Sequence, residues 1–340
     1  MKALFDKTRL GSICLKNRLF RAATFENRGS KDLVDEMFMV YQNLARGGVG
    51  TIITGFTDVL GLEVYEESFL SQYKKITSMV HEYDTKIVLQ IGYRGSFMFK
   101  DEHVIWGPSA VQNVRTKIKP KEMTQEDIQL MQKAFGDAAQ RAKEAGFDGI
   151  ELQGTHSCLL GQFVSPYYNR RNDEYGGSIE NRAKMIFETY NTVRKKVGYE
   201  YPVLIKLSCM EDARRGITFQ DCSYLCGKLS QLGIDAIEIS CDWYPQSIKD
   251  NWFKEHVAEI AAHNKVPIIL AGGNREFAAM TETLTKTSIE YFSLARPLIA
   301  EPDLIQRWEQ GNRNKAKCSS CNACLNFDGA FFCILNTSQC

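Results

Sequence analysis

Short apolar runs alternate with amphipathic helical stretches along almost the whole chain. TIITGF, KIVLQI and PIILAGG are near-continuous apolar runs, which is typical of strands covered on both faces. Thr124–Gly146, Glu180–Val197 and Phe219–Leu232 instead repeat apolar residues at helical spacing. The expected strands are Arg18–Thr24, Thr51–Phe56, Lys86–Tyr93, Gly149–Gly154, Val203–Cys209, Ala236–Cys241, Val266–Gly273 and Tyr291–Pro297. Eight such β-α units predict a single-domain α/β protein with the (β/α)8 TIM-barrel fold.

An open doubly wound sheet is the alternative arrangement of these units. It is disfavoured because no G-x-G-x-x-G turn follows the first strand. We expect the barrel to span residues 1–313, with a long excursion over Arg94–Glu122 after the third strand. A cysteine-rich segment, 314–340, would pack on the barrel or trail it. Glycines that follow predicted helices suit left-handed C-caps at Gly47, Gly146, Gly198 and Gly233.

Composition excludes several classes of partner. The chain has 340 residues, of which 24% are charged, and a net charge of +1, whereas a dedicated nucleic-acid binder would carry a basic patch or stripe. No apolar run reaches membrane-spanning length, and the N-terminal MKALFDKTRLGS lacks the apolar core of a signal peptide. We therefore expect a cytoplasmic protein with no nucleic-acid or membrane partner. We separately expect it to be a homo-oligomer.

Glycines and an arginine follow the last two predicted strands. Strand seven ends in Ala271-Gly272-Gly273-Asn274, and strand eight ends in Ala295-Arg296-Pro297. Glycines let backbone N–H groups approach a ligand, and the loops after strands seven and eight are the usual phosphate site of such barrels. These loops predict phosphate binding. The alternative, that the glycines only turn the chain, explains each feature singly but not both loops together.

Two polar side chains interrupt strands that are otherwise apolar. Gln90 lies near the end of the third strand, and Lys206 lies within VLIKLSC. A buried, unpaired lysine is costly, so Lys206 needs an anionic or acceptor partner. Each side chain alone could simply bond a neighbouring loop. In one barrel mouth with a phosphate site, the two together indicate donors to a polar planar ligand.

The segment Asp148–Arg182 leaves a buried strand and enters a helix through a long connection without periodicity of its own. A connection of this length inside a domain is functional or disordered, and this one is too rich in aromatic and apolar residues for disorder. Gln153 and His156 bracket two small residues at the end of the strand, and Cys158 follows. We expect a site there.

Several motifs resemble the Old Yellow Enzyme family of FMN-dependent oxidoreductases, and the likeness covers nearly the whole chain. They are LKNRLFRAAT, GGVGTIITG, QIGYRG, SPYYNRRNDEYGGSIENR, AGG and ARPLIAEPDL. The run SP…N-R-R-x-D-E-Y-G-G-S-x-x-N-R is highly specific. The resemblance implies an FMN cofactor, reduction by NADH or NADPH, and a small-molecule electron acceptor such as an activated alkene, a quinone or another flavin.

The resemblance also assigns cofactor contacts. Ala23 and Thr24 would face the flavin ring, while Gly55 and Phe56 would contact its edge. Gln90 would bond the pyrimidine portion of the flavin. Lys206 stands where the family commonly has Arg and would stabilise the anionic reduced flavin near N1 and O2. The phosphate would be held by Gly272, Gly273, Ala295 and Arg296.

The expected catalytic segment departs from the family pattern. The family has H-x-x-H or H-x-x-N, whose side chains bind a substrate carbonyl, and this chain has Gln153 and His156, which can still donate hydrogen bonds. The family's proton-donating Tyr is replaced by Cys158, whose thiol has a pKa of ~8.5 against ~10 for a phenol. Cys158 is therefore either a proton donor or inert packing. Tyr93, in place of the usual His, and Trp243 are the expected substrate contacts.

Eleven cysteines are present, and four of them cluster near the C-terminus with the spacing C-x2-C-x2-C-x8-C: Cys318, Cys321, Cys324 and Cys333. Four thiolates at short spacing are typical of a zinc site or an iron–sulfur cluster. Larger relatives within the resemblance carry a [4Fe–4S] cluster just after the barrel, with slightly longer spacing. The alternative is a residual motif with free thiols. The seven scattered cysteines are expected to be small buried hydrophobes.

The sequence thus predicts an NAD(P)H:acceptor oxidoreductase of the Old Yellow Enzyme type, in which hydride passes from NADH or NADPH through flavin N5 to the acceptor. Two rival functions remain open. One is a phosphate-binding barrel lyase or aldolase with Lys206 as Schiff-base nucleophile. The other is a flavin-binding or electron-transfer scaffold with reduced catalysis.

Overall fold

Eight parallel strands close into a barrel. The computed structural model describes residues 2–24, 33–61, 65–97, 104–211, 216–241, 253–325 and Cys333. The strands follow one another around the barrel in chain order, and the last pairs with the first. They are β3 (Leu19–Arg21), β4 (Thr51–Ile53), β6 (Lys86–Gly92), β9 (Gly149–Gly154), β10 (Val203–Ser208), β11 (Ala236–Ser240), β12 (Ile268–Ala271) and β13 (Tyr291–Leu294). The predicted (β/α)8 fold and all eight predicted strands are confirmed.

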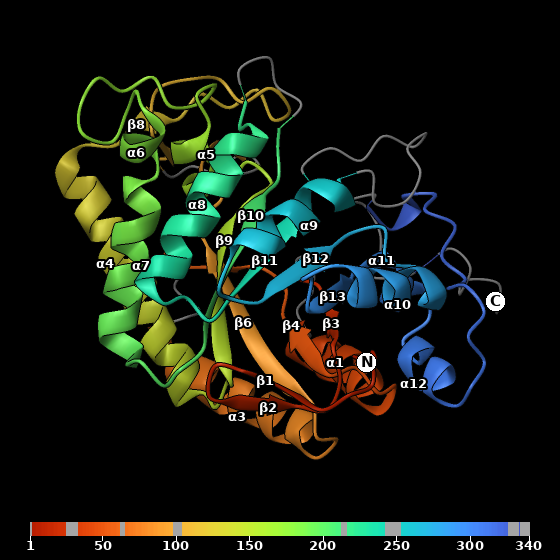
Figure 1. The fold of residues 1–340 in the computed structure, drawn as a ribbon. Coiled ribbons are helices and arrows are strands. Elements are labelled where there is room, and N and C mark those ends of the chain that lie inside the picture. Colours follow the sequence, from red (N-terminus) through yellow and green to blue (C-terminus); the bar gives the residue numbers. More distant parts are fainter. Residues whose placement is uncertain are drawn as a thin grey trace.

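Helices cover the outside of this barrel (Figure 1). The longer ones are α1 (Leu33–Arg46), α3 (Glu67–His81), α4 (Gln125–Glu144), α7 (Lys184–Val197), α8 (Phe219–Leu232), α9 (Lys254–His263) and α10 (Phe277–Lys286). Short helices occupy the connections: α5 (Leu159–Val164), α6 (Ile179–Arg182), α11 (Arg296–Ala300) and α12 (Leu304–Glu309). None of the helices in the described ranges is long and apolar enough to cross a membrane.

Local sequence sets the helix boundaries. Thr124 closes a capping box with Asp127 at the start of α4, and Thr218 does the same for α8. Gly233 ends α8 in the left-handed conformation, as expected.

Two expectations for helix boundaries need correction. Gly48, rather than Gly47, takes the positive φ after α1. Gly47 instead lies too close to the Pro302 carbonyl for any side chain. The predicted helix Glu180–Val197 is divided into α6 and α7 at Ala183.

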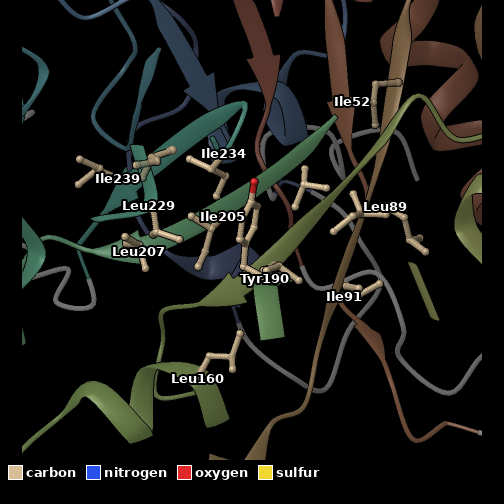
Figure 2. Close-up of a cluster of buried hydrophobic side chains, with 14 of the residues drawn as sticks. Ile52, Leu89, Ile91, Leu160, Tyr190, Ile205, Leu207, Leu229, Ile234 and Ile239 are labelled. Atoms are coloured by element: carbon tan, nitrogen blue, oxygen red, sulfur yellow. The ribbon is translucent and has the colours of Figure 1, made fainter. Parts of the chain in front are cut away.

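The core has two layers. Outward-facing strand residues pack under the helices, as Figure 2 shows for Ile52, Leu89, Ile205 and Ile239. Inward-facing residues such as Phe20 fill the barrel with a second cluster. A hairpin of β1 (Thr8–Leu10) and β2 (Ile13–Leu15) contributes to this inner cluster and closes the barrel at the N-terminal ends of the strands. The interior is therefore packed at that end, which leaves the C-terminal ends for a site.

Additional segments surround the C-terminal ends of the strands. β5 (Thr57–Asp58) extends the sheet beside β6, and the excursion after β6 carries the 3-10 turn Gly95–Phe97 and the short pair β7 (Trp106–Gly107) and β8 (Lys121–Glu122). Near the C-terminus, Ala316 N donates to Arg275 O at 2.9 Å, and the segment ends its described part in the 3-10 turn Ala323–Leu325. The division into a barrel of residues 1–313 and a segment of 314–340 stays a prediction.

Candidate functional site

Lys206 has the anionic partner that its burial requires. Its ammonium nitrogen lies 2.7 Å from Glu238 Oε1, and both side chains are buried. The two residues are register partners on β10 and β11, and Lys206 is also the partner of Gln153 on β9. Glu238 was not predicted as a site residue from the sequence. It could have been, because Glu238 is a charged residue within the apolar strand AIEIS, just as Lys206 is within VLIKLSC.

Gln90 is held in the same way by an acid on the next strand. Its amide nitrogen donates to Glu151 Oε2 at 2.7 Å, and the two residues are register partners on β6 and β9. Burial, and then the negative charge of Glu238, raises the pKa of the Glu151 carboxyl well above its usual range. Burial thus favours the neutral form of Glu151, which is a second residue that the sequence reasoning missed.

The turn after β9 carries the predicted catalytic residues. Gln153 is buried, and its Oε1 has no hydrogen-bond partner within the part of the chain that the structure describes. His156 and Ser157 follow with φ values of 54° and 56°. Two successive non-glycine residues in the left-handed region cost free energy, and such strain gathers at functional sites. Cys158 comes next and is buried at the start of α5.

Backbone and side-chain hydrogen bonds tie this turn to the end of β6. The Gln162 amide nitrogen donates to the carbonyls of Arg94 and Ser157, and Leu159 N donates to Tyr93 O at 2.9 Å. Trp106 N donates to the Tyr93 hydroxyl at 3.2 Å, which directs that hydroxyl toward β7. The predicted substrate contact at Tyr93 thus lies beside the catalytic turn.

Arg94 adds a cation beside the same turn. Its guanidinium lies 4.9 Å from the centre of the Phe56 ring. Burial lowers the pKa of Arg94, and the neighbouring Cys158 and Asp58 oppose that shift. Sequence reasoning passed over Arg94 because arginines within loops are usually solvated surface residues.

The ends of β3 and β4 bring further predicted contacts toward the mouth. β3 ends at Arg21, so Ala23 and Thr24 follow it in the loop. The buried Arg21 guanidinium donates to Ile53 O at 2.9 Å and to the Thr24 hydroxyl. Gly55 N donates to the Tyr41 hydroxyl at 3.3 Å. The side chains of Tyr41 on α1 and Arg21 on β3 therefore fix the loops predicted to face a flavin, with the Ile53 carbonyl of β4 as an acceptor.

The predicted phosphate loops have the backbone that such a role needs. Gly272 and Gly273 have φ values of 101° and 68°, which a side chain would strain. Asn274 ties the loop after β12 to strands β12 and β13, because its amide nitrogen donates to Leu270 O at 2.7 Å and to Ser293 O at 3.0 Å. Ala295 follows β13 and precedes α11.

Arg296 makes a contact that the sequence did not predict. Its guanidinium donates to Asn322 Oδ1 in the cysteine-rich segment. The predicted phosphate site and that segment are therefore neighbours.

Three of the four C-terminal cysteines lie near one another. Cys318 and Cys333 are buried together against Ala300, whereas Cys321 is exposed. Burial, followed by the charge of Cys318, raises the pKa of the Cys324 thiol, and Arg296 opposes that shift. Over the described ranges, no group of three or more His, Cys, Asp or Glu side chains is arranged to hold a metal ion, so a metal site stays a prediction.

Six of the seven scattered cysteines lie within the described residues, and Cys340 lies outside them. Five of the six are buried, as expected: Cys158, Cys209, Cys222, Cys226 and Cys241. Cys14 is exposed because it lies on the outer face of the β1–β2 hairpin. The predicted substrate contact at Trp243 lies outside the described residues.

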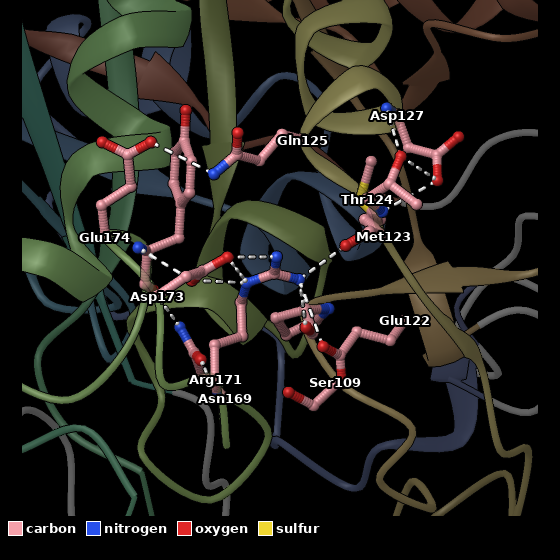
Figure 3. Close-up of polar contacts among 12 residues, drawn as sticks. Ser109, Glu122, Met123, Thr124, Gln125, Asp127, Asn169, Arg171, Asp173 and Glu174 are labelled. Atoms are coloured by element: carbon pink, nitrogen blue, oxygen red, sulfur yellow. Dashed lines mark hydrogen bonds and ion pairs between the residues drawn. The ribbon is translucent and has the colours of Figure 1, made fainter.

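The later half of the connection, Ser165–Arg182, forms a hydrogen-bonded framework (Figure 3). The Arg171 guanidinium donates to Met123 O at 2.6 Å, to Pro108 O at 3.0 Å and to both carboxylate oxygens of Asp173. The Asn169 amide nitrogen donates to the carbonyls of Phe163 and Tyr175, both at 2.7 Å.

Arg182 completes this framework at its far end. Its guanidinium donates to the Val164 carbonyl and forms an ion pair of 2.8 Å with Asp221 on α8. The framework thus joins the excursion after β6, the connection after β9 and helix α8 around the mouth of the barrel.

Comparison with known proteins agrees with this arrangement. The model of the NADH:flavin oxidoreductase / NADH oxidase family matches residues 3–315. A NADH oxidase of Thermoanaerobacter brockii is 29% identical over 342 residues, covering 94% of this chain and 52% of that protein. A NADPH dehydrogenase of Clostridium acetobutylicum is 28% identical over 314 residues, covering 88% of this chain and 92% of that protein.

Among solved structures, morphinone reductase in complex with tetrahydroNAD matches with a TM-score of 0.79 and 26% identity, covering 92% of each chain. The chain thus spans about half the length of the NADH oxidase and nearly all of the other two proteins.

Proposed function

Because the chain belongs to the NADH:flavin oxidoreductase / NADH oxidase family, we propose that it is an FMN-dependent oxidoreductase. It would take hydride from NADH or NADPH and pass it to a small electrophilic acceptor, such as an activated alkene, a quinone or another flavin. The observation that carries this proposal is the set of polar groups at the C-terminal ends of adjacent apolar strands. Gln90, Gln153 and Lys206 converge there from β6, β9 and β10.

The residues present fit FMN. The Gln90 amide and the Lys206 ammonium supply hydrogen-bond donors for the pyrimidine portion of a flavin, and the buried Gln153 Oε1 offers an acceptor to a bound molecule. The backbone at Gly272 and Gly273 suits a phosphate, together with Ala295 and Arg296. Ala23, Thr24 and Gly55 would face the ring. Bound FMN would supply the hydride-transfer chemistry, which no protein side chain provides.

The turn after β9 would prepare the acceptor. Gln153 and His156 can each donate a hydrogen bond to a carbonyl oxygen and polarise it, which draws electrons from the carbon that accepts hydride. Cys158 would deliver the proton to the neighbouring carbon, in place of the phenol that the family uses. A thiol on a short side chain is a less extended donor than a tyrosine, so we expect slow reduction of simple enones. Tyr93 and Trp243 would contact the acceptor.

The absorbance spectrum of protein purified without oxygen tests the proposal. We expect flavin bands that bleach when NADH or NADPH is added and return with an alkene or quinone acceptor. A colourless protein that gains no flavin absorbance on addition of FMN would contradict it. Bound flavin that neither nucleotide reduces in stopped-flow measurements would favour the electron-transfer scaffold instead.

The lyase alternative loses support from the ion pair of Lys206. A Schiff-base nucleophile needs a neutral amine, and the Glu238 carboxylate at 2.7 Å stabilises the protonated form. Borohydride trapping of a carbonyl substrate on Lys206 is therefore not expected.

We also propose that the C-terminal cysteines bind a [4Fe–4S] cluster or zinc. The support is that Cys318 and Cys333 are buried together and that both raise the pKa of the Cys324 thiol, which the charge of Arg296 in the predicted phosphate loop lowers. Iron, sulfide and zinc analysis of the same anaerobic preparation tests this, and stoichiometric absence of all three would leave free thiols. The cytoplasmic location and the homo-oligomeric state are likewise proposals.

A further inference from the structure

We infer that two buried glutamates, Glu151 and Glu238, are positioning residues for the cofactor site, one as a neutral acid and the other as a charged counterion. Glu151 would hold the Gln90 amide, and Glu238 would hold the Lys206 ammonium. The inference rests on the proposed function in one respect, because it takes Gln90 and Lys206 to face the flavin.

The strand registers place each polar group opposite its acid. β6, β9, β10 and β11 are consecutive around the barrel. Gln90 is the partner of Glu151 across the first of these boundaries, and Lys206 is the partner of Glu238 across the last. Both contacts measure 2.7 Å, and both acids are fully buried. These contacts therefore fix the side-chain rotamers of Gln90 and Lys206, the two predicted flavin donors.

The net charge of the buried groups determines how many of the two acids, Glu151 and Glu238, can be ionised together. The buried charged groups on these four strands are Glu151, Lys206 and Glu238. Two ionised carboxylates with one ammonium would leave a net negative charge in a low-dielectric interior, which is strongly unfavourable. Because Glu238 is the acid in contact with the ammonium, the geometry favours the proton on Glu151. Burial and the neighbouring Glu238 raise the pKa of the Glu151 carboxyl, which acts in the same direction. A neutral carboxylic acid can still accept the Gln90 hydrogen bond through its carbonyl oxygen.

This arrangement changes what Lys206 offers to a flavin. Its positive charge is already balanced by Glu238, so it supplies N–H donors to N1 and O2 rather than an excess charge. A reduced flavin that carries negative charge would receive less stabilisation than an unbalanced cation would give. The bound flavin should then be a stronger reductant than it would be above a lysine without a counterion.

Matched substitutions to glutamine separate the two acids. Glu151→Gln replaces one neutral group by another of nearly the same shape, so the thermal midpoint should change little. Glu238→Gln leaves a buried ammonium without its counterion, and the thermal midpoint should fall by roughly 5–10 °C. The double variant Lys206→Met with Glu238→Gln removes both charges and should recover most of that loss. All three are measured on the full chain without added FMN.

Flavin binding supplies a second readout. Glu151→Gln should keep the FMN affinity, whereas Glu151→Met should weaken it because the Gln90 amide loses its acceptor. Glu238→Gln should favour reduced over oxidised FMN by about tenfold, which corresponds to a rise of ~30 mV in midpoint potential.

Equal effects of the two glutamine variants, or a larger effect of Glu151→Gln, would overturn the inference. Failure of the unmodified chain to bind FMN would instead reject the proposed function, and the thermal midpoints would still test the assignment of charges.

Discussion

The two halves of the connection after β9 differ in what their polar side chains do. The later half, Ser165–Arg182, uses its polar side chains to hold neighbouring segments. They donate to backbone carbonyls and acids there, from Asn169, Arg171 and Arg182. In Gln153–Cys158, the backbone is strained and Gln153 Oε1 is buried without a protein partner among the described residues. The later half, Ser165–Arg182, is thus held rigidly by its own hydrogen bonds, whereas the earlier half, Gln153–Cys158, has the strained backbone and buried polar atom that gather at functional sites.

This difference explains why the resemblance identifies the family of the chain but does not identify its electron acceptor. The run SPYYNRRNDEYGGSIENR carries the family likeness, and its side chains stabilise the walls of the barrel mouth. The residues expected to touch the acceptor lie in the half where the chain departs from the family pattern. Membership of the family therefore follows from the framework, while acceptor chemistry depends on the turn.

The largest expected effect is on the framework. Arg171→Met would leave the Met123 and Pro108 carbonyls and the Asp173 carboxylate without their buried donor, because the Arg171 side chain is 5% exposed. We expect the free energy of unfolding to fall by about 3 kcal/mol. Urea denaturation measures it.

The neighbouring Arg170 is a matched control within the same motif. Its side chain is exposed and lies over Tyr167, 6.0 Å from the ring centre, and its backbone N–H donates to Ser109 Oγ at 3.0 Å, which a substitution of the side chain leaves in place. Arg170→Met should change the free energy of unfolding by less than about 0.5 kcal/mol. Similar losses for both variants would contradict the view that the framework depends on Arg171.

The next largest effect is expected in the catalytic turn, where a substitution should lower activity rather than stability. His156→Gly removes a donor to the acceptor but relieves a left-handed backbone with φ of 54°. We expect kcat/KM with an alkene acceptor to fall about 100-fold, while the stability stays the same or rises by up to ~1 kcal/mol. His156→Asn, which tolerates the same φ and keeps an N–H donor, should recover part of the activity. A large loss of stability in His156→Gly would show that the turn is structural.

The barrel could be predicted because its signals are local. Near-continuous apolar runs such as KIVLQI and helices with clear caps give the elements directly, and eight β-α units allow few arrangements. The exchange of Gly47 for Gly48 as the positive-φ residue could not be predicted. The close approach of Gly47 to Pro302 could not be predicted either, because Pro302 is remote in sequence.

The site was predicted only where a residue stood out within its own segment. Lys206 and Gln90 did so, and their partners did not, because the pairing of Glu151 and Glu238 depends on strand register rather than on sequence spacing. The contact of Arg296 with Asn322 could not be predicted either, because it joins the barrel to a segment that is distant in sequence.

A smaller effect tests Cys158. If the thiol donates the proton to carbon, Cys158→Ala should slow alkene reduction about tenfold, while reduction of the flavin by NADPH should stay unchanged. Cys222→Ala is a matched control, because Cys222 is also buried and lies on α8 rather than in the turn after β9. Equal rates of alkene reduction in the Cys158 variant and the unmodified protein would assign Cys158 to packing and the proton to water.

The smallest expected effect is the pH dependence of the framework. Hydrogen bonds from Arg171 hold the pKa of the Asp173 carboxyl below its usual value. A lowered folded-state pKa stabilises the fold above the unfolded value of ~3.9, and that stabilisation is lost as the pH falls through the folded-state pKa. Because Asp173 is 32% exposed, the contribution should stay below about 1 kcal/mol. The difference in free energy of unfolding between the unmodified protein and Asp173→Asn should therefore be present at neutral pH and shrink in acid below ~3.9. A difference that does not change with pH would mean that Asp173 acts through its shape rather than its charge.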